Sequence, residues 1–461
     1  MRKVLRVFLA AGLSALLFGC ATVYNQPMNV PLRGSVQDSL RIGFEDRALQ
    51  DDAIVGLAFS GGGTRAAAFS FGVLQEMERI PLRGASVPMI DRLDFISGVS
   101  GGSVIAAYYG LKKREALLDF REKFLLRNAE EYLSTNVSLA NFSRAFGGGV
   151  NDQTGLTRFL DQQLFQGATF AHLRASRRPR IWINASDIYN RTSFVFGETA
   201  FAAICSDLLA YPLSDAVAAS AAVPFAFAPI VVQAYPGQCT DPLPRWVERA
   251  RSNPNAPPIL SSFAKAISRY REGQVPYIKL LDGGLVDNYG LAGFVIAREA
   301  SQVPYGPLTP QQAVKLRRAL FLVVDARAGV PADFVRTVEG PHGIELIKAA
   351  VDTSLEATVG ASYSAFDATM GEWQASLIRW RCGLSAADRA RYGARPNWNC
   401  RDLKFFIGRL AFDQLDAARA AQLAAVPTSF KLPQEQVDAV IAAGRDTLRQ
   451  STVMKAFVSG L

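Results

Sequence analysis

The sequence predicts an α/β fold with a mainly parallel central sheet. Short apolar runs of strand length alternate with segments of helical composition along most of the chain. Two glycine-rich turns lie between such a strand and the helix that follows it. This alternation is typical of parallel strands that are joined by helical crossovers.

The predicted elements follow one another in chain order. A buried strand is expected at residues 53–60, and a helix is expected at residues 66–80, where Pro81 ends it. A short strand at residues 93–97 precedes a helix at residues 103–111. Further strands are expected at residues 179–186, 277–281, 320–324 and 404–407.

The main domain is expected at residues 53–326, with two insertions and a C-terminal extension. Residues 111–146 have the composition of a helical insertion, and residues 236–276 are a proline-rich excursion from the sheet that could act as a lid. Residues 327–461 are expected to form a helical and mixed extension packed on the main domain. The alanine-rich part of this extension, residues 410–461, is expected to be helical.

The composition is that of a globular protein with ample apolar material for a core. Of the 461 residues, 49% are hydrophobic and 20% are charged, which excludes a disordered chain, a collagen-like fibre and a small disulfide scaffold. The formal charge is +9, and it is +6 without the first nineteen residues. This surplus suits a protein near anionic lipid head groups, and it equally suits an ordinary solvated surface.

Residues 1–19 are interpreted as a signal peptide. A basic start is followed by the uncharged residues 7–19, which are too short to span a bilayer as a helix. The sequence Leu-Phe-Gly-Cys that ends at Cys20 resembles the bacterial lipobox, in which the cysteine is acylated and becomes the mature N-terminus. Residues 20–52 would then be a polar tether, and Ala21 favours the outer membrane. An ordinary secretory signal with a chance cysteine is the alternative.

Apart from Cys20, the cysteines are expected to form disulfides. The four that remain are Cys205, Cys239, Cys382 and Cys400. Their even number and an exported protein favour oxidation, and spacings of 34 and 18 residues suggest two local bridges, although the other pairings stay open. A zinc site is not expected, because the chain has no CxxC motif and its only histidines are His172 and His342.

The strongest local signal for chemistry is the Gly-Val-Ser-Gly-Gly turn from Gly98 to Gly102. A serine on a sharp strand-to-helix turn projects its hydroxyl clear of the sheet, and the glycines leave room for the reversal of the chain. The helix that follows directs its positive N-terminal end at this serine. Ser100 is therefore a candidate nucleophile, and a plain glycine-rich turn is the alternative.

A second turn, Gly61-Gly62-Gly63-Thr64-Arg65, exposes a row of backbone amides at a helix start. Such a row can bind a phosphate or stabilise the oxyanion of an acyl-transfer intermediate. A nucleotide-binding loop is poorly supported, because no Gly-Lys-Ser/Thr follows. The nearby serine turn favours the oxyanion role.

A third signal is Asp282, which ends an apolar strand and is followed by Gly283 and Gly284. Such an aspartate is placed to reach a catalytic centre, or it simply forms a turn. Two bases are conceivable for the serine. The order Ser100, Asp282, His342 matches a serine–histidine–aspartate esterase, whereas a dyad would have Asp282 accept the serine proton directly.

Together these motifs resemble the patatin-like phospholipase family. The resemblance covers about residues 53–326, and it includes a small-residue block at 218–224 and a strand and turn at 183–187. One departure is Ala66, where the family motif usually ends in glycine. The resemblance implies a three-layer α/β fold in which helices cover both faces of the sheet.

The resemblance also implies a lipid acyl hydrolase that works through a Ser–Asp dyad and an acyl-enzyme. Ser100 would be the nucleophile and Asp282 the base, while the oxyanion hole would come from Gly61, Gly62 and Gly63. Arg65 would brace the loop or meet a lipid phosphate, and a plain surface arginine is the alternative. No metal or cofactor is implied, and the expected partner is a phospholipid or another acyl lipid rather than a nucleic acid. Alternatives are a non-catalytic lipid-binding envelope lipoprotein and a transacylase.

Overall fold

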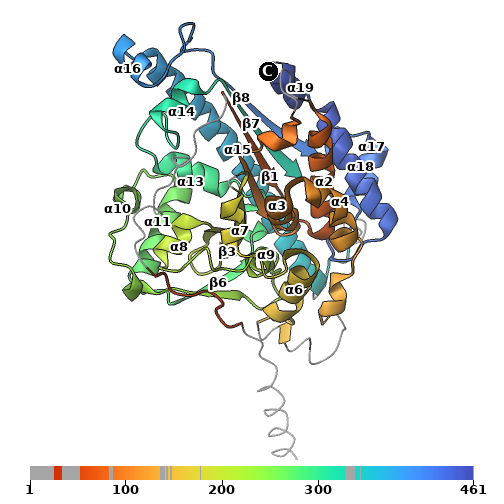
Figure 1. Cartoon of the computed structure of the whole chain (residues 1–461). Coiled ribbons are helices and arrows are strands. Elements are labelled where there is room, and N and C mark those ends of the chain that lie inside the picture. Colours follow the sequence, from red (N-terminus) through yellow and green to blue (C-terminus); the bar gives the residue numbers. More distant parts are fainter. Residues whose placement is uncertain are drawn as a thin grey trace, which may run out of the picture.

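The protein is built around one eight-stranded mixed sheet. A computed structural model describes residues 25–33, 52–81, 87–134, 141, 144–145, 148–176, 178–327, 338–342 and 344–459. From one edge to the other the strands are β5 (Ile230–Gln233), β6 (Tyr277–Asp282), β3 (Arg180–Asp187), β2 (Phe95–Val99), β1 (Ala53–Phe59), β7 (Arg318–Asp325) and β8 (Lys404–Ala411), and β4 (Thr192–Phe196) pairs with β3 (Figure 1).

The sheet is mainly parallel, as the sequence predicted. Strands β3, β2, β1, β7 and β8 run in the same direction. The pairs β3–β4, β3–β6 and β5–β6 are antiparallel. Strands β4 and β5 were not predicted from the sequence. Strand β5 lies in a long uncharged run that begins at residue 216, which the structure divides into the last part of helix α9 (Leu213–Ser220), a proline-containing loop and the strand.

Helices cover both faces of the sheet, which confirms the three-layer prediction. One face packs on α2 (Gly63–Arg79) and α3 (Gly101–Lys112), and the other packs on α13 (Ala292–Ala300) and α15 (Ile344–Cys382). Strand β1 serves both cores, because alternate residues of a strand point to opposite faces. Leu57 belongs to the first core, and Ala58 belongs to the second.

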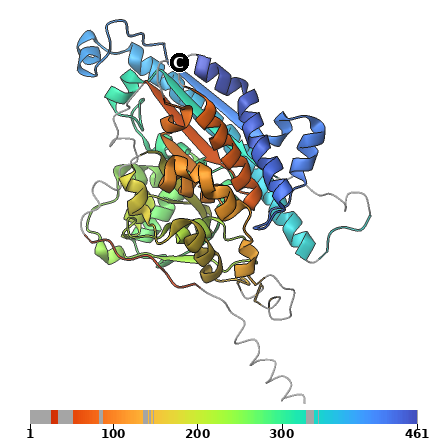
Figure 2. The same ribbon diagram turned by 45° about the vertical axis from the view of Figure 1, so that its right-hand side comes forward.

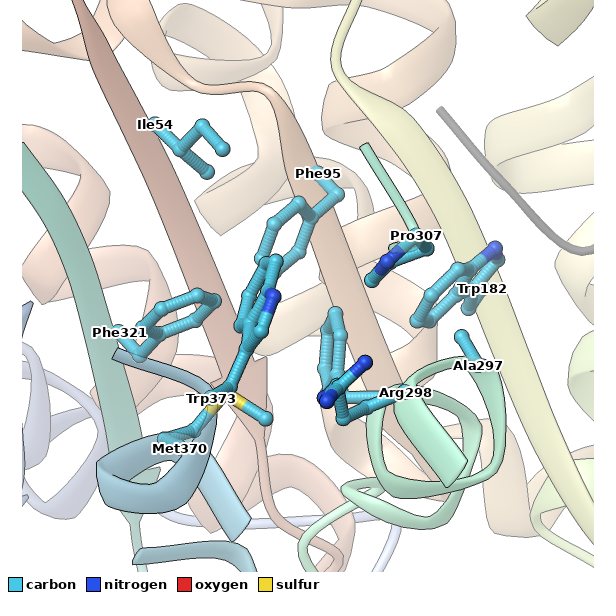
Figure 3. A pocket seen from close by; sticks show the side chains of 10 residues that line it. Ile54, Phe95, Trp182, Ala297, Arg298, Pro307, Phe321, Met370 and Trp373 are labelled. Carbon is cyan, nitrogen blue, oxygen red and sulfur yellow. The ribbon is translucent and has the colours of Figure 1, made fainter. Parts of the chain in front are cut away.

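The second core contains a small aromatic cavity near the amino ends of the strands. Its walls include Phe95, Phe321 and Trp373 (Figure 3). Gly56 makes room for this packing, because a Cβ at that position would lie 1.9 Å from the ring of Phe95. The predicted turns at Ser100 and at residues 61–65 follow the carboxyl ends of β2 and β1, so the cavity lies at the other end of the sheet.

The C-terminal extension shares the sheet and the first core with the main domain. Strand β8 pairs with β7 over its whole length, and α18 (Gln434–Gln450) packs on α2 (Figure 2). The helices approach so closely that a Cβ at Gly72 would lie 2.1 Å from the carbonyl oxygen of Ile441. A boundary near residue 326 therefore marks no break in the packing.

Both predicted insertions contain helices. In its described part the first insertion forms α4 (Ala116–Phe120) and three short helical turns, Lys113–Glu115, Arg121–Leu125 and Ala129–Tyr132. The second contains α10 (Arg245–Ser252) and α11 (Pro258–Arg271). Helix α11 buries its apolar side chains against α13 and β4, so this part of the proline-rich segment belongs to the core.

The described part of the expected tether lies against the folded body. Within residues 25–33, the amide of Leu32 donates to the carbonyl of Cys205 at 2.8 Å, and the amide of Asp207 donates to Val30 at 3.0 Å. These residues of the predicted tether are therefore docked on the folded body. The predicted signal peptide and Cys20 lie outside the described residues. None of the helices in the described part of the chain has the length and apolar character that a membrane span requires.

The structure contains two disulfides. Cys205 pairs with Cys239, and Cys382 pairs with Cys400. These are the two local bridges that the spacing suggested.

Candidate active site

Ser100 occupies a sharp turn between β2 and α3. Its backbone has φ 50° and ψ −124°, a conformation that costs a non-glycine residue on the order of 1–3 kcal/mol. The residue is only 5% exposed. Such a strained residue persists only where its surroundings hold it in place, and this marks the turn as a functional candidate.

Neighbouring glycines allow the serine turn to approach the glycine-rich loop. A Cβ at Gly101 would lie 1.9 Å from the carbonyl oxygen of Gly63, and one at Gly102 would lie 2.6 Å from that of Ser60. At Gly98 a Cβ would lie 2.7 Å from the Cα of Ser103. The two turns that the sequence singled out are therefore in direct contact.

A buried hydrogen-bond network holds the serine turn in place. The amide of Ser100 donates to the hydroxyl of Ser220 at 2.8 Å, and this hydroxyl donates to the carbonyl of Asn184 at 2.6 Å. The side-chain amide of Asn184 in turn donates to the carbonyl of Gly98 at 2.9 Å and to the hydroxyl of Ser97 at 2.8 Å. Side chains from α9 and β3 thus fix the start and the centre of the turn.

Asp282 lies beside Ser100 at the end of β6. It pairs with Ala185 of β3, at the same level as the end of β2. Its carboxylate accepts a hydrogen bond from the amide of Gly284 at 2.8 Å and interacts with the hydroxyl of Ser100. Burial raises the pKa of Asp282 to about 6, although both of these hydrogen bonds act in the opposite direction.

The glycine-rich loop offers two amides rather than three. The amide of Gly61 donates to Asn288, to its carbonyl at 3.1 Å and its side-chain oxygen at 3.2 Å. The amides of Gly62 and Gly63 make no hydrogen bond within the described ranges. Both of these glycines have positive φ, 137° and 59°. The predicted set of three donors is therefore reduced to Gly62 and Gly63 at the start of α2.

Arg65 braces the glycine-rich loop. Its side chain is buried, with 2% exposed. Nε donates to the carbonyl of Ala326 at 2.7 Å, Nη2 donates to the hydroxyl of Thr428 at 3.0 Å, and Nη1 donates to the carbonyl of Val426. These contacts and the burial of the side chain favour the brace over a lipid phosphate ligand and over a plain surface arginine.

A segment of the C-terminal extension covers the same loop. The amide of Thr64 donates to the carbonyl of Ser429 at 2.9 Å. A Cβ at Gly63 would lie 2.6 Å from that carbonyl oxygen, so the third glycine is needed for this contact. This contact could not be predicted from the sequence, because more than 360 residues separate the two segments.

The two histidines lie in exposed positions. His342 lies in the described residues 338–342, just before α15. His172 caps α7 (Phe170–Ala175), where its Nδ1 accepts a hydrogen bond from the amide of Thr169 at 3.1 Å. The groups that shift the pKa of Asp282 are its own buried surroundings, Gly284 and Ser100, and they include no imidazole. Within the described ranges, no group of three or more potential metal ligands occurs.

Comparison with known proteins identifies the family. A family model described as patatin-like phospholipase matches residues 57–295, which include both turns and Asp282. The chain belongs to the patatin-like phospholipase family. This patatin-like protein is accordingly an enzyme of the serine-hydrolase type that acts on lipid esters.

Solved structures that resemble the patatin-like protein are distant in sequence. VipD from Legionella pneumophila is 12% identical with a TM-score of 0.33, over 89% of this chain and 67% of that one. Human GIVD cytosolic phospholipase A2 is 12% identical with a TM-score of 0.41, over 92% of this chain. The match spans 62% of the length of the human protein. No curated protein sequence matches the chain significantly.

Proposed function

We propose that the protein hydrolyses acyl esters of membrane lipids with Ser100 and Asp282 as a catalytic dyad, here called the catalytic pair. The observation that carries this proposal is the position of the buried Asp282 carboxylate beside the hydroxyl of Ser100 on the strained turn, where the two groups interact. A direct base of this kind needs no imidazole between the two groups. The exposed position of His342 argues against the triad alternative.

The first half of the reaction acylates the serine. Asp282 accepts the hydroxyl proton while the oxygen of Ser100 bonds to the ester carbonyl carbon. Negative charge then develops on the carbonyl oxygen, and the amides of Gly62 and Gly63 are placed to stabilise it, by roughly 3–4 kcal/mol for each donor. As the tetrahedral intermediate collapses, the protonated Asp282 gives its proton to the leaving alcohol oxygen.

The second half regenerates the enzyme. Asp282 accepts a proton from water, whose oxygen attacks the acyl carbon, and the same two amides hold the oxyanion again. Collapse of this intermediate releases the fatty acid and returns the proton to Ser100. A pKa of about 6 suits Asp282 to both roles, because near neutral pH it is a carboxylate that can still be protonated during the reaction.

The N-terminal sequence supports a proposal for the cellular location of the enzyme. Acylation at Cys20 would hold the enzyme on the bacterial outer membrane, facing the periplasm, beside its lipid substrates. Confinement to the membrane raises the effective concentration of lipid at the active site. The two disulfides suit an oxidising compartment.

The decisive experiment incubates the wild type, Ser100→Ala, Asp282→Asn and His342→Ala with a mixed bacterial lipid extract and identifies the products. We expect fatty acid release by the wild type and His342→Ala, and none by the other two variants. A fluorophosphonate should label Ser100 in the wild type and in His342→Ala, and it should label neither of the other two variants. Loss of activity in His342→Ala with retention in Asp282→Asn would overturn the dyad. Acyl transfer to an added alcohol would instead indicate a transacylase.

A further inference from the structure

Residues 25–33, here called the N-terminal strap, bind the edge strand β5 and the loop before it. The side chain of Asn29 pairs with Gln233 as a backbone group of a neighbouring strand would. Its Nδ2 donates to the carbonyl of Gln233 at 2.8 Å, and its Oδ1 accepts a hydrogen bond from the backbone amide of Gln233 at 2.8 Å. Asn25 donates to the carbonyls of Ala228 and Pro229 at 3.1 and 3.0 Å. Both asparagines are buried, so the strap has a fixed place on the protein.

The strap lies beyond the catalytic pair, at the carboxyl end of the sheet. Asp282 pairs with Ala185, at the level of Ser100. From there β6 continues past the ends of β1 and β2 to Tyr277, which pairs with Gln233. At about 3.3 Å per residue, this places Tyr277 roughly 16 Å beyond Asp282. The strap runs along the same end of the molecule, beneath β6 in Figure 1.

Large apolar and aromatic side chains are exposed around the strap. This set, here called the rim, consists of Met28, Val30, Ile188, Tyr189, Phe225 and Tyr277. On the strap itself, Met28 and Val30 flank the buried Asn29, so they point outward as the side chains of an extended segment do. The other members lie on β6, on the turn after β3 and on the loop that Asn25 binds.

Cations accompany the two tyrosines of the rim. The Nζ of Lys279 lies 5.6 Å from the ring centre of Tyr277, and the guanidinium of Arg269 lies 5.8 Å from that of Tyr189. Tyrosine is favoured where an apolar layer meets water, and lysine and arginine are attracted to anionic head groups. The rim therefore combines the three kinds of side chain that suit a lipid surface.

We infer that the rim is the face with which the protein lies on an anionic bilayer, an inference that rests on the proposed action on membrane lipids. The position of the predicted anchor agrees with this orientation. Cys20 precedes Asn25 by five residues, which span at most about 18 Å, so an acyl group on Cys20 would enter the bilayer next to the rim. The catalytic pair then faces the membrane that holds the anchor.

Quenching of an added tryptophan tests the orientation without any need for hydrolysis. The full chain carrying Ser100→Ala would be reconstituted in phosphatidylethanolamine–phosphatidylglycerol vesicles with brominated acyl chains. Val30→Trp is compared with Val303→Trp. The two valines are similarly exposed, Val30 by 46% and Val303 by 37%, but Val303 contacts Arg298 near the amino ends of the strands. We expect the added emission at position 30 to fall by about half or more and that at position 303 to stay unchanged. Equal quenching at both positions, or none at position 30, would overturn the inference.

Charge substitutions at the same two positions test the consequence for activity. Val30→Asp should lower hydrolysis of vesicle phospholipid about ten-fold and leave hydrolysis of a soluble short-chain ester unchanged, since it acts only on contact with the bilayer. Val303→Asp should change neither. Unchanged vesicle hydrolysis in Val30→Asp would contradict the inference. If the wild type cleaved neither substrate, the proposed function would fail, and the quenching result would still decide the orientation.

Discussion

At the scale of single residues, the burial of Asp282 links activity to stability. Its carboxylate form accepts the serine proton, so kcat/KM should rise about ten-fold per pH unit below pH 6 and level off above it. Its pKa of about 6 in the folded protein exceeds the ordinary value of 3.8. The folded state therefore binds the extra proton between about pH 4 and pH 6, and the protein loses stability as the pH rises through this window.

Asp282→Asn should abolish hydrolysis and stabilise the fold at high pH. The oxygen of the introduced side-chain amide can still accept the hydrogen bond from the backbone amide of Gly284. Because the introduced side chain is uncharged, its burial costs less free energy than that of the carboxylate. We expect the free energy of unfolding at pH 8 to increase by up to about 3 kcal/mol and the difference to vanish near pH 4. Denaturant unfolding at pH 4, 6 and 8 measures this, with Ser100→Ala as the inactive control that keeps the carboxylate. A variant less stable than the wild type at pH 8 would refute the argument.

The sequence identified the functional residues that lie in tight turns, because such turns require glycines beside them. It did not identify the residues that act through side-chain hydrogen bonds. Ser100 and Asp282 stood out because tight turns place glycines beside them. Ser220 and Asn288 carry no such mark, because a serine or asparagine occurs in many roles and only the fold brings them to the site. For the same reason, the sequence could not show that the amide of Gly61 already donates to Asn288 and is therefore not available to an oxyanion.

At the scale of elements, local pattern predicted the strands of the parallel sheet and missed those added by tertiary contacts. Strands β1, β2, β3, β6, β7 and β8 all overlap predicted apolar runs. Strand β5 has four residues and forms only because β6 and the strap offer partners on its two sides. Propensity over so short a segment is weak compared with such pairing.

The crossing of α2 and α18 should depend on glycine. A methyl group at Gly72 would meet the carbonyl of Ile441 on α18, so Gly72→Ala should force the helices apart and destabilise the fold by about 1–3 kcal/mol. Gly371 in α15 has open space around it, and Gly371→Ala should be neutral or stabilising by up to about 1 kcal/mol. Thermal unfolding of both variants tests this pair. Equal effects would mean that the close crossing is not required.

The segment that covers the glycine-rich loop should affect the chemical step more than stability. Thr428→Val removes the hydroxyl that Arg65 uses to hold the loop, at similar side-chain volume. We expect kcat to fall about ten-fold with KM nearly unchanged, because misplaced loop amides stabilise the oxyanion less well. Thr452→Val, at an exposed threonine in the same extension, is the control and should keep full activity. An effect of Thr428→Val on KM alone would show that the segment shapes binding instead.

At the scale of the whole molecule, the chain folds as one unit although the family match covers only residues 57–295. The extension supplies β8 to the sheet, α18 to the first core and α15 to the second. It also covers the glycine-rich loop through Ser429. The sequence predicted a C-terminal extension packed on the main domain. Its place in the sheet could not be predicted, because strand order depends on pairings between distant segments.

The two disulfides should stabilise this unit to similar extents but differ in what else they hold. They close segments of 34 and 18 residues, for which loop entropy gives about 4 and 3 kcal/mol. The carbonyl of Cys205 accepts a hydrogen bond from the amide of Leu32, and Cys239 lies in the same small apolar cluster as Leu32. The first bridge therefore also supports the strap, whereas the second ties the end of α15 to the segment before β8.

Replacing each bridge by two serines separates these roles, and each variant is the control for the other. Both should unfold at lower denaturant concentration than the wild type, and both should still hydrolyse a soluble short-chain ester, because neither bridge touches the catalytic pair. Hydrogen exchange of residues 25–33 should accelerate only when Cys205 and Cys239 are replaced, since only that bridge contacts the strap. Faster exchange in the strap of the Cys382/Cys400 variant as well would mean that the strap responds to global stability and not to its own contacts.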